Sequence, residues 1–155
     1  MRVGNGFDSH RFSKGVPLIL GGVNIPHARG LLSHTDGDVV VHALIDAIIG
    51  AMGTGDIGTY FPDTDERHRG RSSLELLREV IQDVLRRGFR IEWADVTVIA
   101  EEPKIGPYRT DIMKNLVKSG LPEGRISIKA KTNEGMGFVG RGEGVAALAT
   151  VLLGE

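Results

Sequence analysis

Apolar residues recur at helical spacing in three stretches of the chain, 35–52, 72–87 and 107–120. The first stretch is apolar on a second face as well, so we expect this helix to be buried on most of its sides. The second stretch has a single apolar stripe, formed by Leu74, Leu77, Ile81, Val84 and Leu85. The pattern therefore predicts three helices, joined by segments of a different character.

Hydroxyl and acidic residues mark the starts of the first two helices. Thr35 is followed by Asp38 at the spacing of a capping box, in which the hydroxyl and the acid satisfy free backbone N–H groups. Ser72 and Glu75 repeat this arrangement before the second helix. Thr35 and Ser72 are therefore the predicted N-cap residues.

The segments between the helices predict strands. Residues 91–100 are rich in β-branched side chains, and residues 125–132 alternate apolar with polar side chains, as a strand with one solvated face does. Residues 2–12 indicate a further extended segment, and residues 17–26 a tight hairpin. Residues 142–153 contain enough alanine for a helix, but we interpret them as a strand because the other elements need a partner strand.

Strands alternate with helices along the chain, and no boundary or internal repeat divides it. This order favours helices packed on a mixed sheet. We therefore expect one α/β domain over residues 1–155. Its two layers, an α+β arrangement, would be a sheet of about four strands and a set of helices on one face.

The composition excludes several kinds of chemistry. The 155 residues include 22 glycines and no cysteine, which rules out disulfides, iron–sulfur clusters, all-cysteine zinc sites and thiol nucleophiles. The formal net charge of −1 argues against nucleic acid as the partner. No signal peptide is visible, and the longest largely apolar run, 145–153, is far shorter than the ~20 residues of a membrane-spanning helix. We expect no membrane partner and a cytoplasmic protein, or a plastid one if a transit peptide has been removed.

Asp8, His10 and His42 are candidate metal ligands. Asp8 and His10 are two positions apart on an extended segment and so share one face, while His42 lies one turn inside the first helix. One carboxylate and two imidazoles leave a fourth position open, which is the composition of a catalytic zinc site. Two alternatives stay open: Asp-x-His is common as a surface hydrogen-bonded pair, and a histidine on an apolar helix is often a core residue.

The start of the first helix is a candidate anion site. The free N–H groups of a helix start favour a phosphate or a developing negative charge, and His34 lies beside them. A helix cap alone would not explain this histidine. Asp38 precedes His42 by one helical turn, so it could orient that imidazole as a hydrogen-bond acceptor.

The loop 53–70 is rich in glycine and aspartate and also contains aromatic residues. Asp56 and Asp63 in this loop could bind the hydroxyls of a polyol. Residues 100–107 run from a strand end to a helix start, where Lys104 could meet a phosphate or a base carbonyl. A solvated loop and a proline-braced turn are the alternatives for these two segments.

A second glycine-rich segment, residues 135–144, follows the last predicted strand but one. It lacks the Gly-Lys-Ser/Thr ending of a phosphate-binding Walker loop. Thr132 and Glu134 directly precede it and could hold a hydroxyl and a hard cation, since Mg²⁺ takes one or two carboxylates together with substrate phosphates.

Six motifs stand in order over nearly the full chain. They are Gly6-Phe7-Asp8-Ser9-His10, Leu20-Gly21-Gly22, His34-Thr35-Asp36-Gly37-Asp38, Gly55-Asp56-Ile57-Gly58, Phe61-Pro62-Asp63-Thr64-Asp65 and Gly137-Phe138-Val139-Gly140-Arg141-Gly142-Glu143-Gly144. With these motifs the chain resembles the 2-C-methyl-D-erythritol 2,4-cyclodiphosphate synthases, lyases of the non-mevalonate isoprenoid pathway.

The resemblance implies a reaction and an assembly. The 2-phosphate of 4-diphosphocytidyl-2-C-methyl-D-erythritol would attack the β-phosphorus of the same molecule, closing the cyclic diphosphate and expelling CMP. The assembly would be a homotrimer with its sheets toward the threefold axis and its active sites between neighbouring subunits. Because the nucleophile belongs to the substrate, catalysis would rest on positioning and on charge neutralisation by two cations.

The resemblance also implies roles for individual residues. Asp8, His10 and His42 match the zinc ligands, and Glu134 matches the ligand of a second cation, Mg²⁺ or Mn²⁺. A central cavity on the trimer axis, which can hold an isoprenoid diphosphate, would be lined by Phe7, Phe138, Arg141 and Glu143.

His34 and Thr132 match residues that stabilise the transition state. The residues expected to contact the substrate are Asp8, His10, His34, Thr35, Asp56, Ile57, Gly58, Phe61, Asp63, Asp65, Ala100, Lys104, Ile105, Gly106, Lys131, Thr132, Asn133, Glu134, Phe138 and Arg141. Of these, Asp56, Gly58 and Asp63 match contacts to the erythritol. Ala100, Lys104, Ile105 and Gly106 match the cytidine pocket, which residues 131–134 close.

Two other functions remain open at the level of sequence. A phosphohydrolase could use the same zinc to activate water. A trimeric module could instead bind isoprenoid diphosphates without catalysis. The products formed from the diphosphocytidyl substrate separate these alternatives.

Overall fold

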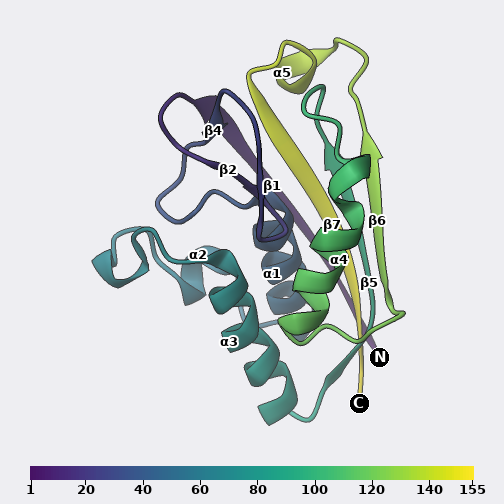
Figure 1. Ribbon diagram of the computed structural model, residues 1–155. Helices are drawn as coiled ribbons and strands as arrows, with labels where there is room; N and C mark the ends of the chain where they lie inside the picture. Colours follow the sequence, from purple (N-terminus) through teal and green to yellow (C-terminus); the bar gives the residue numbers. More distant parts are fainter.

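The computed structural model describes residues 1–155 and contains a mixed sheet with the strand order β4-β1-β7-β5-β6 (Figure 1). The strands are β1 (Arg2–Ser13), β4 (Gly30–Leu31), β5 (Arg90–Ile99), β6 (Ile126–Lys131) and β7 (Gly144–Gly154). β5 and β6 are parallel, whereas the other neighbours are antiparallel. The expectation of four strands was wrong by one. The fifth strand, β4, is two residues long, too short for a periodic pattern to show.

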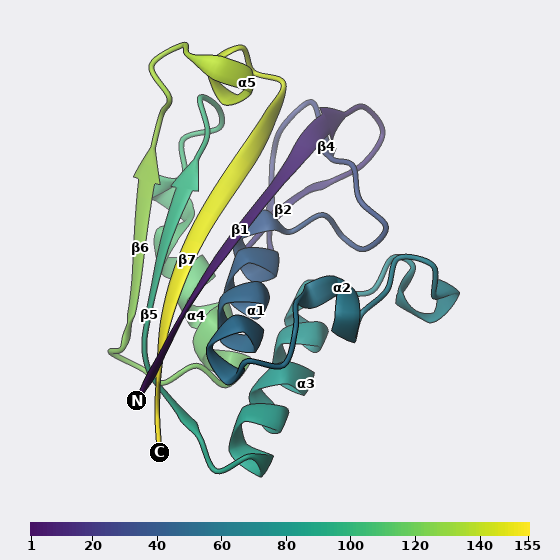
Figure 2. The same cartoon turned by 180° about the vertical axis from the view of Figure 1, so that it is seen from behind.

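The C-terminal segment is a strand, as predicted. β7 lies between β1 and β5 and pairs with both, so it forms the middle of the sheet. Its register with β1 places Arg2 opposite Leu153, and the two chain ends therefore lie side by side (Figures 1 and 2).

The predicted hairpin is also present, as a separate two-stranded sheet of β2 (Leu18–Leu20) and β3 (Val23–Ile25). Gly21 and Gly22 form its turn with φ of 56° and 72°, a region that glycine enters without steric cost. The backbone N–H groups of both glycines donate to Asp38. The hairpin turn is therefore tied to the start of the first helix.

The three predicted helices are present, together with shorter turns. The helical elements are α1 (Val39–Met52), α2 (Ile57–Tyr60), η1 (Glu66–His68), α3 (Ser73–Arg86), η2 (Gly106–Tyr108), α4 (Arg109–Lys118) and α5 (Gly137–Gly140). The segment 53–70, expected to be a loop, thus contains α2 and η1. No helix combines the length and the apolar character needed to cross a membrane.

The helix starts differ in part from the prediction. Thr35 is not the N-cap of α1: Asp38 is, and its side chain accepts a hydrogen bond from the Val41 N–H. Ser72 does occupy the N-cap position of α3, but its hydroxyl makes no capping hydrogen bond. The Ser73 N–H donates instead to Asp36 at 2.8 Å. A carboxylate from a distant part of the chain therefore replaces the predicted capping box.

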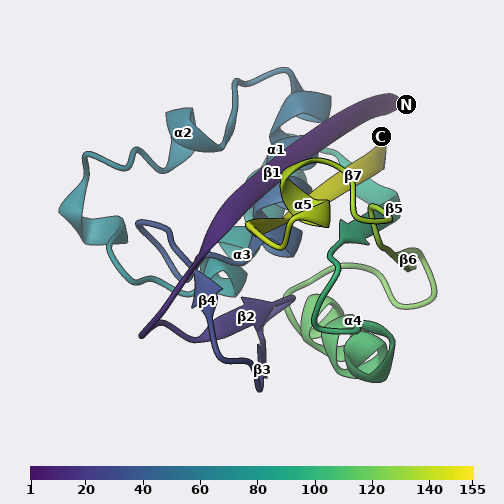
Figure 3. The ribbon, with the colours of Figure 1, turned by 90° about the horizontal axis from the view of Figure 1, so that it is seen from above.

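The helices pack on one face of the sheet, as predicted (Figures 1 and 3). On β7, Val145, Ala147, Ala149 and Val151 are fully buried, whereas Leu148 between them is 46% exposed. One prediction for α3 was wrong, because Leu85 lies outside the buried stripe and is 61% exposed. Leu76 and Val80, which the predicted stripe left out, are fully buried instead.

α1 lies directly against β1 because the strand carries glycine where it faces the helix. A Cβ at Gly4 would come within 2.0 Å of the Ala47 carbonyl oxygen, and a Cβ at Gly6 within 2.0 Å of that of Ala43. The next residues on the same face of β1 are Asp8 and His10. Close packing at the glycines therefore brings these two side chains beside α1.

The opposite face of the sheet is not covered by helices. Large apolar side chains project from it on three strands: Val3 and Phe7 on β1, Trp93 on β5 and Leu148 on β7. Phe7 stands opposite Leu148 in the β1–β7 register. An exposed apolar face of this kind is typical of a surface that contacts another protein.

Candidate functional site

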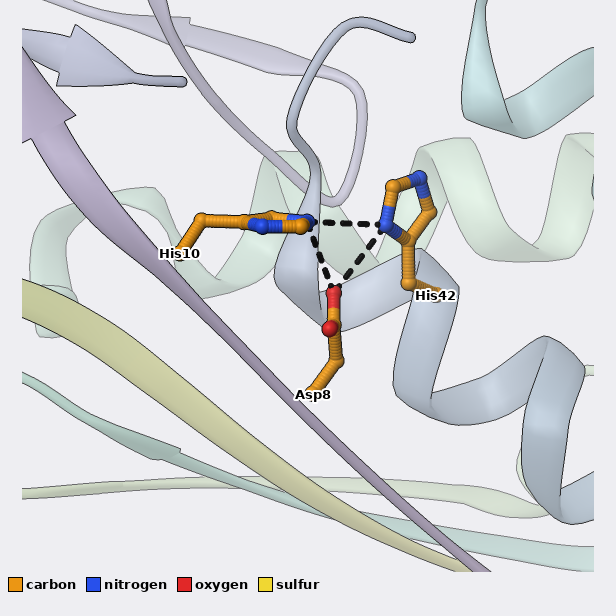
Figure 4. A group of neighbouring side chains, drawn as sticks. All are labelled: Asp8, His10 and His42. Carbon is orange, nitrogen blue, oxygen red and sulfur yellow. Dashed lines mark hydrogen bonds and ion pairs between the residues drawn. The ribbon is translucent and has the colours of Figure 1, made fainter. Parts of the chain in front are cut away.

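Asp8, His10 and His42 converge on one point, as the sequence predicts (Figure 4). β1 presents the first two side chains and α1 presents the third. The Asp8 Oδ2 lies 3.0 Å from the His10 Nε2 and 3.0 Å from the His42 Nδ1, and these two nitrogens are 3.2 Å apart. His42 is nearly buried, while the other two side chains are partly exposed toward a cavity.

The three donor atoms fit a zinc ion. Tetrahedral zinc with bonds of ~2.0–2.1 Å places its donors about 3.3 Å apart, close to the separations in this cluster. One carboxylate oxygen and two imidazole nitrogens supply three of the four positions, and the cavity side leaves the last one free for a ligand. Both alternatives from the sequence, a surface pair and a lone core histidine, leave this convergence of three groups unexplained.

The protonation of the cluster reflects the same contacts. Burial opposes the charge of Asp8, but hydrogen bonds from His10 and His42 outweigh it and hold the pKa of this carboxyl well below its usual range. Burial likewise opposes the charge of His42, but its hydrogen bond to Asp8 and the charge of that residue raise the pKa of the imidazole. Asp8 is therefore ionised over the whole physiological range, as a metal ligand must be.

A cavity of about 510 Å³ opens in front of the cluster. It is lined by Phe7, Asp8, His10, Ser33, His34, Thr35, His42, Asp46, Asp56, Ile57, Gly58, Phe61, Pro62, Asp63 and Leu76. The predicted contacts from the first half of the chain thus meet at one place, with the exception of Asp65. Asp65 lies next to the cavity, where its backbone oxygen is 3.3 Å from the His34 Nε2 and its carboxylate pairs with Arg67.

The wall opposite the cluster is formed by α2 and the residues after it. Asp56 is the N-cap of α2, and its carboxylate accepts from the Thr59 N–H and hydroxyl at 2.8 and 2.7 Å. These hydrogen bonds lower the pKa of Asp56. The carboxylate is exposed and keeps free lone pairs for a hydroxyl-bearing ligand.

The structure gives the Asp38 carboxylate a different role from the one predicted. Asp38 does not orient His42: its oxygens accept from the N–H groups of Gly21, Gly22 and Val41. Burial and the charge of the adjacent Asp36 raise the pKa of Asp38 to about 6, although these N–H groups favour the charged form. The prediction failed because Asp38 is the cap of α1, so its side chain turns back over the helix start.

Asp46 lines the cavity and was not among the predicted site residues. Its Oδ1 accepts from the Ile57 N–H at 3.1 Å and so ties α2 to α1. Its position in the sequence could have indicated this role, because Asp46 follows His42 by one helical turn and so lies on the same face of the helix.

The predicted contacts from the second half of the chain lie elsewhere. Residues 100–106 follow β5, Lys131 ends β6 and residues 132–134 follow it, and none of these residues lines the cavity. The Glu101 carboxylate joins the two segments by accepting from the Asn133 N–H at 2.7 Å. Two strands, β7 and β5, lie between β1 and β6. At ~4.8 Å per neighbouring pair, β1 and β6 are therefore roughly 14 Å apart. Figure 3 shows α2 and β6 on opposite sides of the molecule.

Lys104 and Arg141 line a second, smaller cavity of about 380 Å³, together with Glu101, Glu102 and Arg29. Phe138 is 40% exposed, and Arg141 forms an ion pair with Glu143 at 2.6 Å. Glu134 does not join the histidines and acids of the metal cluster within this chain. One chain therefore contains two separate groups of the predicted residues.

Comparison with known proteins decides the family. The model of the YgbB family matches residues 1–154, which is nearly the whole chain. This chain belongs to the YgbB family. The matched region contains Asp8, His10 and His42.

Curated YgbB-family relatives have names that agree with the resemblance. A 2-C-methyl-D-erythritol 2,4-cyclodiphosphate synthase from Syntrophus aciditrophicus is 54% identical over 157 residues, covering 100% of this chain and 98% of the relative. The synthase of Marinobacter nauticus is 49% identical over 154 residues, covering 99% of this chain and 97% of that relative.

Solved structures show the same fold as this YgbB-family chain. A 2C-methyl-D-erythritol-2,4-cyclodiphosphate synthase in a CDP-bound form has a TM-score of 0.89 at 44% identity, covering 99% of this chain and 100% of that one. The bifunctional IspDF of Campylobacter jejuni has a TM-score of 0.93 at 44% identity, covering 98% of this chain and 42% of the bifunctional protein.

Proposed function

We propose that this protein converts 4-diphosphocytidyl-2-C-methyl-D-erythritol 2-phosphate to 2-C-methyl-D-erythritol 2,4-cyclodiphosphate and releases CMP. The observation that carries the proposal is the Asp8–His10–His42 cluster, which opens into a cavity whose far wall is the acidic α2 segment. Full-length relatives at about half identity bear the name of this synthase. This reaction requires no protein nucleophile, because the attacking oxygen belongs to the substrate.

The metal cluster would hold zinc, and Glu134 would hold a second cation, Mg²⁺ or Mn²⁺. Bound there, the cations would neutralise phosphate charge that accumulates as the ring closes. The donor set of Asp8, His10 and His42, with one position left open, supports a catalytic rather than a structural zinc site.

The protein side chains would position the reacting groups. Asp56, Asp63 and the Gly58 backbone would hold the erythritol hydroxyls against the far wall of the cavity. His34 and Thr132 would donate to the phosphate oxygens on which charge develops. Holding the nucleophile and the electrophile of one molecule in line removes an entropic barrier that reaches ~7–11 kcal/mol in favourable model systems.

We propose that the cytidine site is completed by a neighbouring subunit. Ala100, Lys104, Ile105 and Gly106, with residues 131–134, would receive the nucleotide, and they lie outside the metal cavity of their own chain. A related synthase structure holds CDP, which is consistent with a cytidine nucleotide as part of the ligand. The exposed apolar face of the sheet supports a trimer in which the sheets surround the threefold axis.

An isoprenoid diphosphate would bind near the axis of that trimer, between Phe7 and Phe138, with Arg141 as the cation for its phosphates. The cytoplasmic location remains a prediction from the sequence. Hydrolysis by a zinc-activated water and binding without catalysis remain the competing functions.

Phosphorus NMR of the products tests the proposal. We expect incubation with the diphosphocytidyl substrate and Mg²⁺ to give the cyclic diphosphate together with CMP. The His42→Ala variant is the control: it should lose both zinc and turnover, because one of three donors is removed, while the oligomer persists. A simple hydrolysis product would favour the phosphohydrolase, and an unchanged substrate would favour the binding module. Full zinc occupancy in the variant would contradict the ligand assignment.

A further inference from the structure

The imidazole of His42 has a second nitrogen that faces away from the metal cluster. Its Nδ1 points to Asp8 and His10, whereas its Nε2 lies 2.8 Å from the Ser73 Oγ and 3.0 Å from the Thr35 Oγ1. Ser73 is the first residue of α3 and is fully buried. A neutral imidazole binds a metal only through the nitrogen that carries no proton. The partner of Nε2 therefore decides whether Nδ1 is available as a ligand.

The hydrogen bonds of Ser73 determine the direction of this contact. Its hydroxyl donates a hydrogen bond to the Asp36 Oδ1. An ionised carboxylate only accepts hydrogen bonds, so the single hydroxyl proton of Ser73 is directed at Asp36. Toward His42, the Ser73 oxygen can then only accept. The Nε2 of His42 must therefore carry a proton. In this structure Nδ1 also donates to Asp8, so the proton lost on metal binding is the one on Nδ1, and Nδ1 then supplies the lone pair.

Asp36 is fixed in this role by two backbone groups. Its Oδ2 accepts from the Ser73 N–H at 2.8 Å, and its Oδ1 accepts from the Asp38 N–H at 3.2 Å. The same carboxylate thus binds the start of α3 and the residue that caps α1. Its position behind His42 is determined by the packing of the two helices, not by a flexible side chain.

We propose that Ser73 and Asp36 are positioning residues for the metal ligand His42. They keep the proton on Nε2, hold the ring plane, and so present the Nδ1 lone pair to the metal. This inference rests on the proposed zinc site, because it describes how one of the ligands is prepared. Outer hydrogen-bond partners of metal-binding histidines commonly act in this way.

Zinc affinity, measured by competition with a chromophoric chelator, tests the proposal without reference to turnover. We expect Ser73→Ala to weaken zinc binding by about 10–100-fold, the usual range for loss of such a partner. Ser72→Ala is the matched control at the same helix start, since the Ser72 hydroxyl makes no capping hydrogen bond. Zinc affinity should be unchanged in this control. Equal affinity of the wild type and Ser73→Ala overturns the inference.

Asp36→Asn provides a second variant of nearly the same shape. An amide nitrogen at either oxygen position would oppose at least one N–H group that now donates there. We expect a similar loss of zinc affinity, and no further loss when Asp36→Asn is combined with Ser73→Ala, because the two residues act in series. Additive losses would show that they act separately and would overturn the inference.

Nitrogen NMR of the histidine side chains in the unchanged, zinc-loaded protein is independent of how any variant folds. We expect a proton on Nε2 of His42 and the metal-bound signature on Nδ1. The opposite tautomer would overturn the inference and leave the zinc site standing. A wild-type protein that binds no zinc would overturn the proposed site, and the inference with it.

Discussion

Gly6 determines how closely α1 approaches the strand that carries two of the proposed metal ligands. Its missing side chain leaves room for the Ala43 carbonyl oxygen, which a Cβ would meet at 2.0 Å, and for the Ala47 nitrogen at 2.6 Å. The clash is with backbone atoms, which cannot turn aside. Substitution must therefore push α1 away from β1, and His42 would move with the helix.

We expect Gly6→Ala to destabilise the protein by about 1–3 kcal/mol, the usual cost of overpacking a core, and to weaken zinc binding as well. Gly50→Ala is the matched control in α1. A Cβ there meets nothing closer than 3.9 Å, so alanine should stabilise the helix by about 0.5–1 kcal/mol. Urea denaturation of both variants measures the two effects. Unfolding midpoints that shift in the same direction would contradict the close-packing argument.

At the level of single residues, the sequence was informative where one local pattern determines the outcome. The spacing of Asp8 and His10 on a strand, and the place of His42 in a helix, made the three residues candidate ligands of one metal, and the structure brings them together. Asp36 and Ser73 could not be linked to His42 in this way. Their contact depends on how α3 packs against α1, which no spacing along the chain records.

At the level of elements, α2 forms the wall of the cavity although it has only four residues. None of its residues is fully buried; Ile57 and Tyr60 pack partly against the core, and hydrogen bonds add to this support. The Tyr60 hydroxyl donates to the Asp83 Oδ2 on α3 at 2.9 Å and lies 2.9 Å from the Thr54 Oγ1. Together with the bond from the Ile57 N–H to Asp46, these contacts fix α2 between the two large helices.

Tyr60→Phe should therefore loosen α2 without altering the metal cluster. Loss of a hydrogen bond costs about 1 kcal/mol net, so we expect KM to rise roughly fivefold as the binding-competent arrangement becomes less populated. Zinc affinity should stay at the wild-type value, because Tyr60 contacts none of the three ligands. Steady-state kinetics and chelator competition measure the two quantities. A large loss of zinc with unchanged KM would place the effect of Tyr60 at the metal instead.

Most elements were predictable because their patterns are long. The β-branched run of β5, the alternation of β6 and the stripe of α1 each span enough residues for periodicity to be visible. The failures were short or depended on tertiary contacts. β4 and α2 are shorter than a pattern can show, and Asp38 caps α1 because the hairpin turn of Gly21 and Gly22 also binds it.

At the scale of the whole molecule, the predicted site divides into two groups that one chain does not bring together. Asp56 and the metal cluster surround the cavity, while Lys104 and Glu134 lie beyond the ends of β5 and β6. Sequence motifs indicate which residues act on one ligand, but they carry no information on which copy of the chain supplies each one. The division is what a site shared between neighbouring subunits requires.

Mixing two inactive variants tests this arrangement. Asp56→Asn disables the cavity group, and Glu134→Gln disables the second group, so each variant should be inactive alone. In a mixed assembly of the proposed trimer, some sites would combine the intact cavity group of one chain with the intact second group of its neighbour. Random assembly of equal amounts gives both intact groups at about one quarter of the sites, so we expect about one quarter of wild-type activity after refolding the two together.

The control is Asp56→Asn refolded with the double variant Asp56→Asn/Glu134→Gln. No chain in that mixture has an intact cavity group, so activity should stay absent, whatever the trimers formed. If each site instead belonged to a single chain, neither mixture would recover activity. Recovery in the first mixture alone would therefore establish that two chains supply the residues of one site, and its size would report how freely the subunits assort.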